Sequence, residues 1–163
     1  MQIIEGLLSL LSSLPPWLVV FLISMIPFVE LRGAIPVAIL IYHMPVLTAY
    51  IIAVIGNMVP VIPILIFLGS VEKWLRKYEI WARAMDKLFD KTRRRASRSV
   101  ERYEEVGIML FVAIPLPMTG AWTGSLIAYL FGLEIKKSTF VILLGVLIAG
   151  LVVTAATLGA IMI

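Results

Sequence analysis

Glu30-Leu31-Arg32-Gly33-Ala34-Ile35-Pro36 places a carboxylate and a guanidinium two residues apart inside an otherwise apolar segment that runs from Trp17 to Tyr42. The whole chain of 163 residues is 61% hydrophobic and only 15% charged, whereas soluble domains carry about 25% charged residues. Ionisable groups inside a bilayer are energetically expensive and are usually functional. The composition therefore predicts an integral membrane protein in which Glu30 and Arg32 lie at or near bilayer depth.

Four apolar blocks follow one another along the chain, at about 15–43, 46–69, 106–133 and 137–163. A helix that crosses a bilayer needs roughly 20 apolar residues, and the second and fourth blocks meet this length. The first block offers only the uncharged run Trp17–Val29, which would form a helix of about 20 Å. We therefore expect two full transmembrane helices and two broken segments.

Charge decides how the broken segments are placed. The segment from Glu72 to Glu105 holds 11 of the 14 Lys/Arg and 7 of the 10 Asp/Glu residues, so the positive-inside rule makes it cytoplasmic. If the third block crossed the membrane, Lys136 and Lys137 would lie outside, against that rule. If it enters and leaves on one side, both lysines return to the cytoplasm. We therefore favour re-entrant hairpins over kinked spans for the first and third blocks.

Each half of the chain then consists of one re-entrant hairpin followed by one spanning helix. The predicted fold is an all-α polytopic membrane protein whose two opposed hairpins and two transmembrane helices form an inverted repeat within one domain, 1–163. The first half-repeat is 1–69, the second is 106–163, and 70–105 is a basic amphipathic cytoplasmic insert. Transporters often combine inverted repeats with paired broken helices, and their binding site lies where the breaks meet.

Glu30 and Arg32 are the first candidates for a functional site. Residues two apart do not face each other on a helix, but both can line one cavity if a turn separates them. Arg32 is suited to bind a phosphate or carboxylate, and Glu30 could then carry or gate a proton. The alternative is a static pair in which the two charges neutralise each other at a hairpin tip.

The second break is Pro115-Leu116-Pro117-Met118-Thr119-Gly120-Ala121-Trp122-Thr123-Gly124. Irregular backbone at membrane depth is tolerated only where it is buried in protein or lines a cavity. Thr119 and Thr123 add hydroxyl groups, and Trp122 could stack on a substrate or anchor the hairpin at the membrane interface. We expect this segment to face the first hairpin across a shared site.

Asn57, near the middle of the second block, needs a hydrogen-bond partner at that depth. It could touch a substrate or serve as structural glue, and Pro60 and Pro63 are expected to kink its helix. Cysteine is absent and His43 is the only histidine, so we expect no metal and no other cofactor. Without a close His/Ser/Asp set or a carboxylate pair in the apolar blocks, we expect no enzyme activity.

Together, the E-x-R-G-x-x-P pattern at 30–36, Gly56-Asn57 and the P-x-P-x-T-G-x-W pattern at 115–122 resemble the small multidrug export protein family. That family is in turn distantly similar to the DedA membrane proteins. The resemblance implies paired re-entrant hairpins, lipid translocation and proton coupling, with essential roles for Glu30 and Arg32. The arginine expected in the second hairpin of DedA proteins has no counterpart here, because Thr119 and Trp122 occupy that region.

The sequence thus predicts a multi-pass transporter of the prokaryotic plasma membrane that moves an amphiphilic or anionic solute, with a lipid phosphate as one candidate and a proton carried by Glu30. The alternative is a non-transporting scaffold or lipid-binding protein of the envelope. Membrane lipids and the solute are the expected partners, with no nucleic acid, and two full spans favour a homodimer. The predicted site comprises Glu30, Arg32, Gly33, Pro36, Asn57, Pro115, Pro117, Thr119, Gly120, Trp122 and Thr123.

Overall fold

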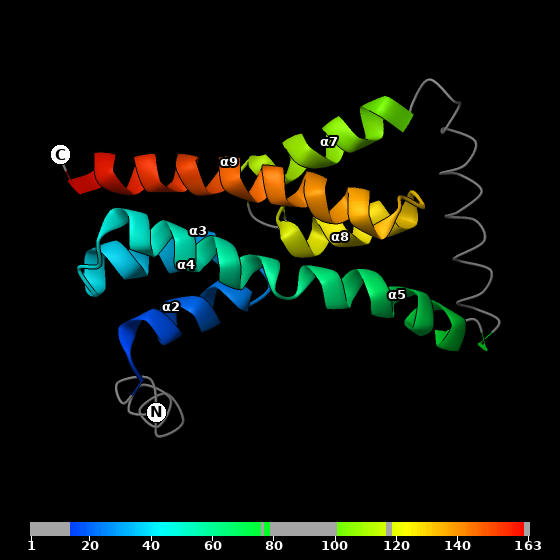
Figure 1. Cartoon of the computed structure of the whole chain (residues 1–163), viewed down its shortest axis with the longest axis horizontal. Helices are drawn as coiled ribbons and strands as arrows, with labels where there is room; N and C mark the ends of the chain where they lie inside the picture. The colour runs from blue at the N-terminus through cyan, green and yellow to red at the C-terminus, as the bar shows by residue number, and fades with distance from the viewer. Residues whose placement is uncertain (1–13, 76, 79–100, 117–118, 162–163) are drawn as a thin grey trace. The chain divides into compact units, whose positions relative to one another are not determined.

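The computed structural model describes residues 14–75, 77–78, 101–116 and 119–161, and within these ranges every regular element is helical. This confirms the predicted all-α class. The described elements (Figure 1) are α2 (Pro16–Met25), α3 (Glu30–Pro36), the π-helical turn η1 (Val37–Ile41), α4 (Val46–Met58), α5 (Val61–Leu75), α7 (Glu101–Ala113), α8 (Ala121–Leu130) and α9 (Ile135–Ile161).

The chain divides into two compact units, which are considered separately. The first unit comprises residues 1–57 and 150–163, and the second comprises 58–149. The long helix α9 contributes residues to both units, and the half-repeats 1–69 and 106–163 stay a prediction. Most of the amphipathic insert 70–105 lies outside the described residues.

In the first unit, α2 and α3 form a helical hairpin. Helix α2 ends at Met25 because Ile26 is extended, with φ −71° and ψ 128°, and Pro27 disfavours helical geometry at the residue before it. The two arms pack against each other. Their 10 and 7 residues correspond to helices of about 15 and 10 Å, well short of the roughly 30 Å hydrocarbon core of a bilayer.

The arm that begins at Glu30 changes its winding at Pro36. Proline has no backbone N–H and therefore cannot complete the hydrogen bond to the carbonyl group four residues earlier. From Val37 to Ile41 the backbone continues as a π-helical turn, which closes with the Tyr42 N–H donating to the Val37 carbonyl oxygen at 3.1 Å. Such turns are frequent at functional sites.

Helix α4 packs closely on α2 at Gly56. A methyl group at position 56 would lie 2.6 Å from the Phe21 carbonyl oxygen and would overlap the Ser24 hydroxyl group. That hydroxyl donates to the Phe21 carbonyl oxygen at 2.7 Å. Only glycine permits this approach, so Gly56 fixes the spanning helix against the first arm of the hairpin.

The second unit contains a similar arrangement. Helices α7 and α8 pack against each other on either side of the second break, and α8 also packs on α5. A methyl group at Gly145 in α9 would lie 2.7 Å from Val112 Cβ and 2.8 Å from the Met109 carbonyl oxygen. In this unit too, a glycine of the following long helix lies against the first arm of a helical hairpin.

Two helical stretches are long and apolar enough to cross a membrane, Val46–Gly69 and Ile135–Ile161. They correspond to the second and fourth apolar blocks. The first of them is interrupted where α4 ends at Met58 and α5 begins at Val61, as expected from Pro60. The sequence therefore identified the spanning helices and both breaks, whereas the re-entrant placement of the hairpins remains a prediction.

Candidate functional site

Glu30 is a buried carboxylic acid at the start of α3, immediately after the first break. Only 3% of its surface is exposed. Its backbone has φ +48°, and its N–H donates to the Ile26 carbonyl oxygen at 3.0 Å across the break. Burial of a charged side chain is costly unless a partner of opposite charge lies nearby.

Arg32 supplies that positive charge. It lies two residues further along α3, its side chain is half-buried, and it interacts electrostatically with Glu30. Residues two apart do not face each other inside a regular helix. This rule does not apply to Glu30 and Arg32, because the backbone of Glu30 is left-handed. The predicted proximity of the two charges is therefore present in the first unit.

The break that precedes Glu30 is built from unusual backbone geometry. Phe28 has φ +71°, Glu30 has φ +48°, and Val29 between them is right-handed helical. Residues other than glycine seldom adopt positive φ, and for a bulky side chain the conformation is strained. Strained residues cluster at binding sites and switch regions, so the geometry supports a functional interpretation of this turn.

Gly33 and Pro36 shape the arm that carries the two charges. The Gly33 N–H donates to the Val29 carbonyl oxygen at 3.1 Å, and a side chain at position 33 would collide with Val29. Pro36 produces the π-helical turn described above. Both residues therefore determine where Glu30 and Arg32 lie, and neither has a chemical group suited to bind a solute through its side chain.

Asn57 is the third polar residue of the first unit that the sequence singled out. It is 1% exposed, and neither its amide nitrogen nor its amide oxygen has a hydrogen-bond partner among the described residues. An unsatisfied buried amide costs about 1–3 kcal/mol. Asn57 is therefore a buried polar group without a hydrogen-bond partner among the described residues, near the point where α4 ends.

Thr119 closes the second break. Its hydroxyl lies 2.6 Å from the Ile114 carbonyl oxygen and 2.8 Å from the Leu116 carbonyl oxygen, and it accepts the Leu116 N–H at 3.2 Å. This hydroxyl satisfies backbone groups that the end of α7 leaves free. The geometry favours a structural role for Thr119 over the predicted solute contact.

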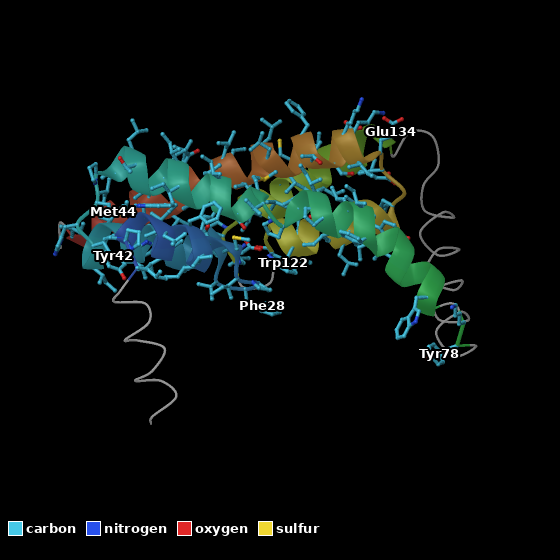
Figure 2. All side chains as sticks on the ribbon, turned by 60° about the horizontal axis from the view of Figure 1, so that its bottom comes forward. Phe28, Tyr42, Met44, Tyr78, Trp122 and Glu134 are labelled. Atoms are coloured by element: carbon cyan, nitrogen blue, oxygen red, sulfur yellow. The ribbon has the colours of Figure 1, made fainter. Side chains whose placement is uncertain are left out.

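The remaining predicted residues of the second break surround the start of α8. Pro115, Trp122 and Thr123 are half-buried, Gly120 is buried with an extended backbone, and Pro117 lies outside the described residues. Figure 2 shows Trp122 on the first turn of α8. Its side chain has an interaction of its own within the protein.

The structure thus places Glu30, Arg32, Gly33, Pro36 and Asn57 in one unit and the residues of the second break in the other. A shared site remains a prediction. Sequence reasoning missed Phe28, because an aromatic residue in an apolar run gives no signal of a left-handed backbone. Among the described residues no group of three His, Cys, Asp or Glu side chains could hold a metal ion.

The two long apolar helices, together with a helical hairpin that buries Glu30, indicate a helical membrane protein. Residues 30–152 match the family described as small multi-drug export proteins. Because the match covers most of the chain and includes every predicted site residue, the chain belongs to this family, which confirms the resemblance seen in the sequence. Comparison with curated proteins and with solved structures gave no match.

Proposed function

We propose that this chain is a membrane transporter that moves an amphiphilic or anionic solute, with a lipid phosphate as the first candidate, and that Glu30 couples this movement to a proton. The family name points to export and is compatible with a transporter. The observation that carries the proposal is the buried carboxylate of Glu30 beside the guanidinium of Arg32 in the break of a helical hairpin.

The pair suggests how a proton and an anion would be coupled. When Glu30 is ionised, it neutralises Arg32 and competes with any anion for the guanidinium. When Glu30 takes up a proton, the charge of Arg32 is no longer compensated by this carboxylate, and an anion becomes its favoured partner. The proton and the anion would therefore bind together and cross in the same direction.

Re-entrant placement of the hairpins is part of this proposal. Arms of 10 residues, such as α2 and α8, reach about halfway through a hydrocarbon core, so both breaks would lie near the midplane. Binding sites of many transporters lie at that depth, between paired broken helices. The same arrangement would account for a distant similarity to DedA proteins.

The repeated glycine contacts support two related halves. Gly56 lies against Phe21 and Ser24, and Gly145 lies against Met109 and Val112. The residues of the second contact follow those of the first by 88 or 89 positions, which agrees with the spacing of the two breaks. Duplicated halves inserted in opposite orientations are a recurring design of secondary transporters.

The first test is flux into proteoliposomes loaded at defined internal pH. Arg32→Ala should reduce uptake of a radiolabelled lipid phosphate by about 10- to 100-fold, because a charge-assisted contact contributes about 1.5–3 kcal/mol. Glu30→Gln, which resembles the protonated state, should still bind the anion, but its flux should no longer respond to a pH gradient.

Glu134→Gln and Lys136→Gln are matched controls, because each removes one charge from an exposed side chain, Glu134 just before α9 and Lys136 in its first turn. Both should transport like the wild type. Equal flux in the wild type, Glu30→Gln and Arg32→Ala proteins would exclude the mechanism and would leave the scaffold or lipid-binding function as the better interpretation.

A further inference from the structure

Phe28 combines three properties that no other described residue shares. Its side chain is 68% exposed, its φ is +71°, and it lies two residues before the buried Glu30. Figure 2 shows it at the turn between α2 and α3. His43, with φ +50°, is also exposed, but it follows the π-helical turn and precedes α4.

The strain at Phe28 is not offset by packing of its ring. A left-handed backbone is unfavourable for any residue with a Cβ atom, and a bulky residue in this conformation is an outlier. Glycine would form the same turn without that cost. Because most of the ring is exposed, the fold itself does not account for a phenylalanine at this position.

The neighbours of Phe28 indicate what the ring contacts. Ile26 and Val29 are also exposed, so the tip of the hairpin presents an apolar surface. Glu30 and Arg32 follow directly and supply the only charges of the hairpin between Pro16 and Ile41. Apolar groups beside a charged pair are complementary to a molecule with an apolar tail and a charged head group.

We propose that Phe28 is a specificity-determining residue that contacts the apolar tail of the transported amphiphile while Arg32 holds its anionic head. The proposal rests on the transport function above and names the substrate class more narrowly. It distinguishes Phe28 from exposed rings on regular helices, such as Phe67 of α5 with 63% exposure, which carry no backbone strain and are suited to face lipid.

The test compares two radiolabelled phosphate monoesters, geranyl phosphate with an apolar tail and methyl phosphate without one. Flux is measured in proteoliposomes, and binding is measured in detergent by tryptophan fluorescence. Phe28→Ala should raise the KM and the dissociation constant for geranyl phosphate about tenfold or more, the factor expected when burial of a phenyl ring is lost. The values for methyl phosphate should change less than twofold.

Phe67→Ala is the control for loss of an exposed ring, and it should affect neither probe. Phe28→Gly and His43→Gly each relieve a positive φ, and both should melt at or up to about 4 °C above the wild-type temperature. Only Phe28→Gly should lose selectivity for geranyl phosphate. A more stable protein with weaker binding of this probe would separate a contact residue from a residue that merely supports the fold.

Each other outcome has a definite meaning. Equal effects of Phe28→Ala on both probes, or no effect on geranyl phosphate, would overturn the contact even if transport is observed. Binding of geranyl phosphate that depends on Phe28, without flux in the wild type, would support the contact and overturn transport. If the wild type neither binds nor transports geranyl phosphate, both proposals are overturned.

Discussion

At the scale of single residues, the chain relies on small groups where backbones approach and on polar groups where helices break. Gly56 and Gly145 show the first use. A methyl group added at either position would overlap a carbonyl oxygen of a neighbouring helix. Glu30 and Asn57 show the second, since both are buried near helix ends. Replacement of a glycine at a close helix contact should therefore affect stability, and replacement of a buried polar residue at a helix end should affect stability or function.

Gly56→Ala tests the close approach of α4 to α2. The added methyl group would meet the Phe21 carbonyl oxygen at 2.6 Å, and a collision with backbone requires the helices to separate. We expect a loss of about 1–3 kcal/mol, as for other overpacked cores, measured by thermal unfolding in detergent. Gly159→Ala is the control, because nothing lies within 4 Å of the added group, and it should gain up to about 1 kcal/mol. Equal melting temperatures for the two variants would contradict the packing described here.

At the scale of elements, the two hairpin turns are closed in different ways. The first turn uses left-handed backbone at Phe28 and Glu30. The second uses the hydroxyl of Thr119, which lies within hydrogen-bond distance of two carbonyl oxygens and one N–H group. In the described part of the second turn a side-chain hydroxyl therefore adds to the backbone hydrogen bonds, whereas the first turn is marked by left-handed backbone.

Replacement of Thr119 tests this contribution. Thr119→Val keeps the shape of the side chain but removes the hydroxyl, leaving backbone groups of Ile114 and Leu116 without this partner. The loss should be about 0.5–1.5 kcal/mol, seen as a lower melting temperature, because the contacts of this hydroxyl are exposed. Thr119→Ser retains the hydroxyl and should melt closer to the wild type than Thr119→Val. If valine and serine were equally tolerated, the hydroxyl would not hold the break.

Much of this element structure could be predicted from the sequence, because prolines and glycines act locally. Pro27 and Pro115 lie at the two breaks, and Pro60 lies between α4 and α5. The left-handed backbone at Phe28 could not be predicted, because a bulky residue in this conformation is an outlier and nothing in the local sequence signals it. The backbone contacts of the Thr119 hydroxyl could not be predicted either, because they depend on the geometry of the break; its contact with a solute stays a prediction.

At the scale of the whole molecule, function depends on which segments cross the membrane. Helix α9 is continuous over 27 residues, and 27 residues span about 40 Å, which is more than a bilayer core requires. The hairpin arms are too short to cross individually. Re-entrant placement of the hairpins stays a prediction that rests on the distribution of lysine and arginine in the sequence.

Single cysteines can test this topology directly, because the natural chain has none. Re-entrant hairpins place Lys77→Cys and Lys136→Cys on the cytoplasmic side, and they place Trp17→Cys, His43→Cys and Ile161→Cys on the opposite side. All five positions are exposed, so a membrane-impermeant maleimide applied to intact cells should label only the last three. If the third apolar block crossed the membrane instead, Lys136→Cys would be labelled from outside and Ile161→Cys would be protected. That result would place the second break on a helix that crosses fully, and the proposed midplane site would lose its second hairpin.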